Sequence, residues 1–221
     1  METRPLSAYN EPMAGIVDYP HRSKPGEPVW ELATLYPVQG RWSRAEYLGF
    51  TDSRRGIEFN AGKLEFLPMP TELHQQIIKR LLLLLYPAVE ATRLGEVLFA
   101  GLRVETTPDQ IREPDLVVML AENSARRTDT VWLGADLVIE VVSEGPSDIR
   151  RDYVEKRAEY EAAGIPEYWI VDPTEKRITV LALRDGKYVE HSVAHDGETA
   201  HSALLADFKV DVHTLFHRDK A

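Results

Sequence analysis

The clearest hydrophobic pattern is a series of short apolar runs in the second half of the chain. Residues 116–120 and 137–142 are apolar at nearly every position, and residues 168–171 repeat the pattern. Runs of this kind predict β-strands that are covered on both faces. The apolar positions between residues 97 and 104 predict another strand. The centre of the fold is therefore expected to be a buried sheet.

Two further pairs of strands are predicted from turn signals. Residues 177–183 and 187–193 flank an Asp-Gly pair at 185–186. This pair readily adopts the positive φ that a tight turn needs, which predicts a β-hairpin. Residues 57–60 and 63–67 form a second, shorter pair of candidate strands.

Three segments have the periodicity or the end signals of helices. Residues 72–93 predict a long helix, and the leucine run at 81–85 predicts that this helix is buried on all sides. Pro87 is expected to kink it. Residues 150–163 stop before a glycine in the usual cap position, and residues 43–48 begin with capping-box spacing.

The order of helix, strands, helix and strands predicts the fold class. It is typical of an α/β sandwich, with a mixed central sheet flanked by helices, and we assign this body to residues 42–221. Residues 1–41 contain six of the 14 prolines and predict an extended arm. Composition leaves open whether this arm packs on the body or a second subunit, through residues such as Trp30 and Tyr36, or is a disordered tail.

Composition and charge limit the possible functions. The 221 residues include 26 Lys and Arg against 36 Asp and Glu, giving a net charge of −10. This charge argues against a protein that coats nucleic acid, but a local nucleic-acid site remains possible if a metal ion supplies positive charge.

Cysteine is absent, which excludes disulfides, thiolate zinc sites and cysteine nucleophiles. Its absence fits a reducing cytosol, so we expect a cytoplasmic protein. No apolar stretch approaches the ~20 residues of a membrane span, and METRPLSAYN lacks the apolar core of a signal peptide. No membrane partner is expected.

Two acidic residues stand inside the apolar runs. Asp115 opens the first run and Glu140 interrupts the second. A buried carboxylate is costly unless it is paired or binds a metal. The two strands can bring both carboxylates to one end of a sheet, where Mg²⁺ would relieve their repulsion. Alternatively, Asp115 lies at an exposed strand edge and Glu140 pairs with Arg103 or Arg112.

The helix predicted after this strand carries a second signal. Asp152 and Lys156 are four residues apart and therefore share a face. Because the helix follows the strand of Glu140, Lys156 can reach back to the strand end and stabilise a pentacovalent phosphate. The alternative is an exposed ion pair worth about a few tenths of a kcal/mol.

Other candidate sites are weaker. His213 and His217 have the i,i+4 spacing of a helical metal site, but no Glu follows His213 as in zincins, and we favour a solvated last turn. A Gly-rich phosphate loop and a Gly-x-Ser-x-Gly elbow are absent, which argues against a nucleoside triphosphatase and a serine hydrolase. A two-carboxylate glycosidase lacks the signature of a sugar cleft.

An ordered series of motifs resembles a known family. The series covers about residues 42–210 and consists of Glu58, Gly62, His74, Pro114–Val118, Asp136–Ser143, Arg151–Asp152, Lys156, Tyr160, Gly164–Trp169 and Val171–Pro173. In this order the motifs are similar to those of the Uma-two family of restriction endonucleases. This family is placed in the PD-(D/E)xK nuclease superfamily, whose core is a mixed sheet flanked by helices. The resemblance implies metal-dependent hydrolysis of phosphodiester bonds in DNA.

The resemblance also implies a set of site residues. Asp115 and Glu140 would bind Mg²⁺, for which Mn²⁺ substitutes, and the backbone carbonyl of Val141 would be a further ligand. The superfamily has a lysine two positions after the second acid, where this chain has Val142. Lys156 is the best substitute for that catalytic lysine.

Three supporting residues complete the predicted site. Glu58 would be a third acidic group or lie behind the ligands, and Asp152 accompanies Lys156. His74 touches the substrate or packs, and we favour packing. We expect a homodimer, because cutting two strands takes two sites. The alternative function is a catalytically inactive nuclease-fold module for nucleic-acid binding or dimerisation, which the valine at 142 favours.

Overall fold

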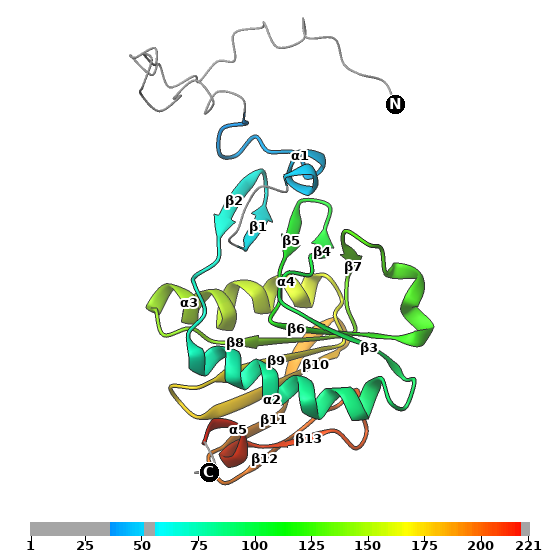
Figure 1. Cartoon of the computed structure of the whole chain (residues 1–221), viewed down its shortest axis with the longest axis vertical. Helices are drawn as coiled ribbons and strands as arrows, with labels where there is room; N and C mark the ends of the chain where they lie inside the picture. The colour runs from blue at the N-terminus through cyan, green and yellow to red at the C-terminus, as the bar shows by residue number, and fades with distance from the viewer. Residues whose placement is uncertain (1–35, 51–55, 218–221) are drawn as a thin grey trace, which may run out of the picture. The chain divides into compact units, whose positions relative to one another are not determined.

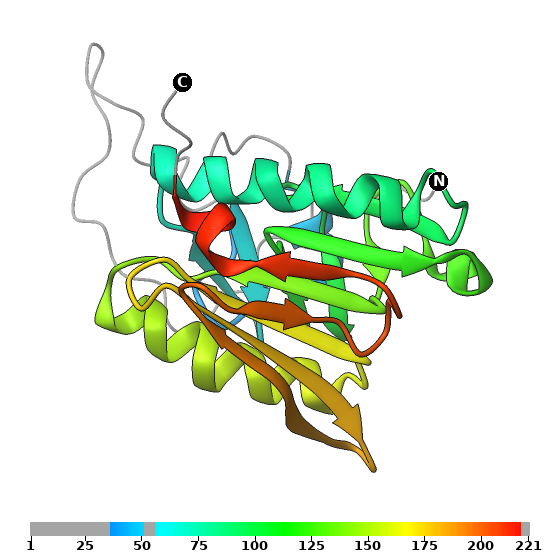
Figure 2. The ribbon, with the colours of Figure 1, turned by 90° about the horizontal axis from the view of Figure 1, so that it is seen from below.

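A six-stranded mixed sheet lies at the centre of the body (Figures 1 and 2). The structure is a computed structural model, which describes residues 36–50 and 56–217. In spatial order the strands are β11 (Lys187–His195), β10 (Arg177–Arg184), β9 (Glu167–Asp172), β8 (Leu137–Val141), β6 (Leu116–Leu120) and β3 (Gly95–Phe99). Only β8 and β9 run parallel, so the sheet is mixed, as predicted.

Helices cover both faces of this sheet, and Figure 2 shows the sheet between them. On one face, α2 (Glu72–Val89) and α5 (Val212–Phe216) pack on side chains such as Ile139. On the other face, α4 (Lys156–Ala162) packs on side chains such as Val138. Neighbouring residues of β8 thus enter opposite cores, which explains why this strand is apolar at successive positions.

A second sheet carries the N-terminal part of the body. Its order is β2 (Lys63–Phe66), β1 (Ile57–Asn60), β5 (Gln110–Arg112), β4 (Val104–Thr107) and β7 (Trp132–Leu133). The helix α1 (Arg44–Gly49) begins at Ser43, and the predicted capping box with Glu46 is present. The rings of Tyr47 and Phe59 stack 5.5 Å apart and tie α1 to β1.

The remaining elements are short. A 3₁₀ segment, η3 (Ala121–Arg126), follows β6, and a two-stranded sheet of β12 (Thr199–His201) and β13 (Lys209–Asp211) precedes α5. The predicted hairpin between β10 and β11 is confirmed, and both Asp185 and Gly186 have positive φ.

Two predictions about local structure are wrong. Residues 97–104 do not form one strand, because the chain turns at Gly101, whose φ is +98°. It thereby passes from β3 in the large sheet to β4 in the second. The leucines of α2 are not buried on all sides either. Leu81 is fully buried, whereas Leu83 is 66% exposed, since the 3.6-residue period turns it away from the sheet.

The helical segment after β8 also differs from the prediction. It begins at Pro146 rather than at residue 150 and has three parts: α3 (Pro146–Arg150), η4 (Arg151–Glu155) and α4. The middle part is a π-helical turn, in which the amide of Lys156 donates to the carbonyl of Arg151. Such turns are rare and often occur at functional sites.

The predicted arm of residues 1–41 lies outside the described residues as far as residue 35, so it stays a prediction. In the part of the chain that the structure describes, no helix has both the length and the apolar composition to cross a membrane.

Candidate active site

Asp115 and Glu140 lie next to each other at one end of the central sheet. The register pairs Leu116 of β6 with Ile139 of β8, so the two acids are level with each other. The amide of Val141 donates to Asp115 Oδ2 at 2.7 Å, which fixes that carboxylate against β8. Both acids line one cleft of about 670 Å³.

His74 reaches the same end of the sheet from the first turn of α2. Its Nε2 lies 3.0 Å from the carbonyl oxygen of Val141 and 3.3 Å from Asp115 Oδ2. A carbonyl only accepts hydrogen bonds, so we infer that Nε2 carries the proton. Burial lowers the pKa of His74, but the hydrogen bond and charge of Asp115 outweigh it and raise the pKa above its ordinary value. His74 therefore contacts the site directly rather than only packing.

Lys156 brings a buried positive charge to Glu140. Its Nζ lies 2.8 Å from Glu140 Oε1, 3.6 Å from Glu58 Oε1 and 3.7 Å from Asp152 Oδ1. The lysine is 2% exposed and Asp152 is also buried, so the alternative of an exposed ion pair is wrong. Burial alone would lower the pKa of Lys156, but these carboxylates, Glu140 foremost, raise it above its ordinary value. These carboxylates thus favour the charged form of the ammonium.

Val142 occupies the position at which the superfamily has lysine, and it faces α4, the helix that carries Lys156. Val142 belongs to the core cluster that contains Tyr160 of α4. Tyr160 donates a hydrogen bond of 2.6 Å to Glu140 Oε1. Lys156 is four residues before Tyr160 and approaches the same oxygen. Tyr160 was not predicted as a site residue, although its spacing from Lys156 places both on one face of a helix.

Glu58 lies behind the cleft and holds its neighbours in place. Its two oxygens accept hydrogen bonds from Arg112 Nη1, at 2.8 Å, and from the amide of Glu113, at 3.0 Å. Burial raises the pKa of Glu58, but the charges of Lys156 and Arg112 outweigh it and lower the pKa below its ordinary value. Glu58 is therefore ionised and anchors the ammonium of Lys156.

The arginines proposed as partners of Glu140 are paired elsewhere. Arg112 binds Glu58 and Glu159, the latter through Nη2 at 2.6 Å, while Arg103 Nε lies 3.8 Å from Glu113 Oε1. The alternative pairing of Glu140 with Arg103 or Arg112 is wrong, because Lys156 takes that place.

Acidic side chains outnumber basic ones in the cleft. Burial raises the pKa of Glu140 to about 7; Lys156 opposes this shift, and the charges of Asp115 and Asp152 add to it. The ionisable residues that line the cleft, apart from His74, are five acids and three bases: Glu113, Asp115, Asp129, Glu140, Asp152, Arg103, Arg151 and Lys156. Carboxylates crowded in this way, next to a backbone carbonyl, fit a hard divalent cation.

Comparisons with known proteins identify the family and the fold of the chain. The family model Uma2, described as "Putative restriction endonuclease", matches residues 44–213. A crystal structure of "a putative nuclease belonging to DUF820" from Anabaena variabilis superimposes with a TM-score of 0.65 at 18% sequence identity, covering 81% of this chain and 98% of that one. A search of curated proteins found no match. The fold is the restriction-endonuclease-like α/β fold, and the chain belongs to the Uma2 family.

Proposed function

We propose that the protein is a metal-dependent endonuclease that hydrolyses phosphodiester bonds in DNA, and that it acts in the cytoplasm. The observation that carries this proposal is the convergence of Asp115, Glu140, the carbonyl of Val141 and Lys156 on one cleft. Membership of a nuclease family supports the same reaction class.

Asp115, Glu140 and the Val141 carbonyl would hold Mg²⁺, or Mn²⁺ in its place. Asp115 Oδ2 and the Val141 carbonyl oxygen both face His74 Nε2, so an ion bound to these two oxygens would displace the ring N–H that now lies between them. When bound, the ion supplies a Lewis acid at the phosphoryl oxygen and lowers the pKa of a bound water. The protein's own part is to keep the carboxylates aligned, and the hydrogen bond from the Val141 amide does this for Asp115.

Lys156 supplies fixed positive charge beside the reacting phosphate. Negative charge grows on the phosphoryl oxygens in the transition state, and a preorganised ammonium stabilises it without any movement of protein groups. Glu58 and Asp152 hold the ammonium in place, and Tyr160 orients the carboxylate of Glu140.

A second function, a catalytically inactive nuclease-fold module that binds nucleic acid or dimerises, is favoured by one observation. Val142 is buried among apolar side chains at the position where the superfamily has lysine. Four charged side chains that are buried or partly buried at the cleft argue against it: Asp115, Glu140, Asp152 and Lys156. Burying charged groups costs free energy, and a purely structural module has no use for them.

We also propose that the protein works as a homodimer, since two strands need two sites. Three exposed apolar side chains of α2, those of Leu83, Leu84 and Tyr86, support a contact with a second copy of this chain.

The first prediction is a hierarchy of variants in cleavage of supercoiled DNA with Mg²⁺. Asp115→Ala and Glu140→Ala should abolish cleavage and weaken Mg²⁺ binding, because each removes a ligand. Lys156→Ala should lower turnover by ~10²–10³ while Mg²⁺ binding, measured by calorimetry, stays nearly intact. Lys156→Arg should retain only part of the wild-type turnover, because the planar guanidinium group of arginine does not replace the compact charge of an ammonium.

The matched control is Lys187→Ala, which removes an exposed lysine paired with Glu161 and should cleave normally. Val142→Lys in the Lys156→Ala background should restore part of the rate, since position 142 faces the same helix. Wild-type turnover in Lys156→Ala would remove Lys156 from the mechanism. A wild-type protein that binds DNA but never cleaves it would favour the inactive module.

The second prediction concerns stability in EDTA at pH 8. The free energy of unfolding of Glu140→Gln should exceed that of wild type by about 1–3 kcal/mol, because the substitution removes one charge from a crowded acidic cluster. Lys156 remains paired with Glu58 and Asp152. The folded-state pKa of Glu140, about 7, lies above its ordinary 4.5, so its stability contribution is complete below pH 4.5 and is lost as pH rises through 7.

The difference in free energy of unfolding between Glu140→Gln and wild type should therefore shrink as the pH is lowered toward 5. Urea unfolding curves measure this difference. Glu65→Gln, which changes a more exposed carboxylate, serves as control and should shift stability little. A Glu140→Gln protein less stable than wild type at pH 8 would mean that Lys156 depends on this carboxylate.

The third prediction concerns the oligomer. Light scattering should give a dimer for the full chain and a monomer for Leu83→Glu, because a charge in an apolar contact is unfavourable. Val189→Glu places the same charge on an exposed apolar position of β11 and should remain dimeric. A monomeric wild-type chain would refute the dimer, and a dimeric Leu83→Glu would refute this surface.

A further inference from the structure

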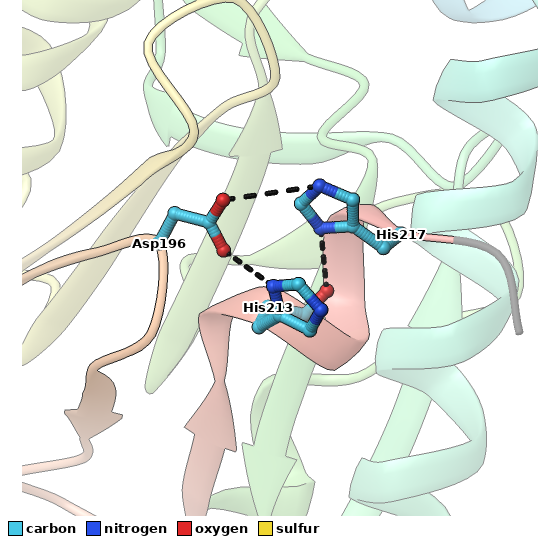
Figure 3. Close-up of side chains that lie close together, drawn as sticks. All are labelled: Asp196, His213 and His217. Carbon is cyan, nitrogen blue, oxygen red and sulfur yellow. Dashed lines mark hydrogen bonds and ion pairs between the residues drawn. The ribbon is translucent and has the colours of Figure 1, made fainter.

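Three side chains from separate segments meet at the surface beside the C-terminal helix. Asp196 follows β11, His213 lies in α5, and His217 follows α5. Each offers one ligand atom, and these atoms lie within 4.8 Å of one another. Figure 3 shows the carboxylate of Asp196 facing both imidazoles. None of the three residues lines the cleft of Asp115 and Glu140.

The hydrogen bonds of the two rings indicate which ring nitrogens could bind a metal. Nδ1 of His217 lies 3.1 Å from the carbonyl of His213, so it carries the proton and Nε2 keeps its lone pair (Figure 3). A ring N–H held by a backbone carbonyl in this way is the usual outer contact of a metal-binding histidine. Nδ1 of His213 lies 2.8 Å from Asp196 Oδ1; to bind the ion through this nitrogen, the neutral ring would take the tautomer with its proton on Nε2.

The two imidazole rings also lie close to each other. The imidazoles stack with their centroids 4.1 Å apart, which keeps both on the same side of α5. Their spacing of four residues alone suggested a solvated last turn. Asp196 changes that interpretation, because it adds a carboxylate from a segment 17 residues earlier in the chain.

We propose that Asp196, His213 and His217 form a binding site for a divalent transition-metal ion such as Zn²⁺, distinct from the carboxylate cleft. Two imidazoles and one carboxylate suit zinc, with water completing the coordination. Mg²⁺ prefers oxygen ligands and binds poorly to such a set. The chemistry of the ligands thus separates this site from the Mg²⁺ site proposed above.

Lys176 limits the affinity of the site. Its Nζ lies 3.2 Å from His217 Nε2 and 3.8 Å from Asp196 Oδ2, so it donates to the lone pair that the metal requires. The lysine side chain is 47% exposed and is free to move into solvent. Its charge repels a cation, and the metal must displace it. Removing this ammonium should therefore strengthen metal binding.

The bound ion would connect α5 to the turn between β11 and β12. Val212 and Leu215 of α5 belong to the core cluster that α2 covers. Closing the segment from Asp196 to His213 with a metal restricts the unfolded chain and stabilises the folded one. The site would therefore act as a clip at the C-terminal end of the body.

The test is calorimetric titration of the full chain with ZnCl₂ in a buffer that contains MgCl₂. His217→Asn should lose one Zn²⁺ binding event or weaken it by at least about tenfold. Lys176→Ala should bind roughly threefold to tenfold more tightly, because a like charge is removed. His191→Asn, which changes an exposed histidine of β11 outside the cluster, is the matched control and should match wild type.

Thermal melting of the same proteins supplies a second readout. Zn²⁺ should raise the melting temperature of wild type and Lys176→Ala more than that of His217→Asn. Zinc that binds the carboxylate cleft contributes equally to every variant and cancels in the comparison. Identical isotherms for wild type, His217→Asn and Lys176→Ala would overturn the proposal, leaving the three side chains as a surface hydrogen-bonded cluster.

Discussion

The buried ammonium of Lys156 is the interaction on which the candidate site depends. It lies within 3.7 Å of oxygens from Glu140, Glu58 and Asp152, which come from three separate parts of the chain. Without this charge, three buried carboxylates would repel one another at one point of the core. Lys156 thereby connects the central sheet, the second sheet and the helix that follows β8. In the proposed mechanism the same charge stabilises the phosphate under attack.

The central strands and the acidic pair followed from the sequence because local rules determine them. Successive apolar residues around Glu140 predicted a strand buried on both faces, and its acid then had to be paired or bind a metal. The break between β3 and β4 could not be predicted in this way. Gly101 decides it through a turn between two sheets, and the alternating apolar pattern continues across that turn.

Contacts between segments that are distant in the chain could not be predicted from the sequence either. The π-helical turn before Lys156, the support from Glu58 and the approach of His74 to Val141 all depend on tertiary packing. Tyr160 belongs to one of the sequence motifs, but its hydrogen bond to Glu140 could not be predicted without knowing how the helix packs on the sheet. The role of Asp196 beside two histidines likewise depends on a turn that no local rule positions.

The central claim is that Asp115, Glu140 and the Val141 carbonyl hold one divalent cation beside Lys156. The most direct measurement is the anomalous scattering of a crystal soaked in Mn²⁺. The account predicts a peak within about 2.0–2.4 Å of oxygens from Asp115, Glu140 and Val141. A fully soaked crystal with no peak in this cleft, or with Mn²⁺ bound only elsewhere, would contradict it.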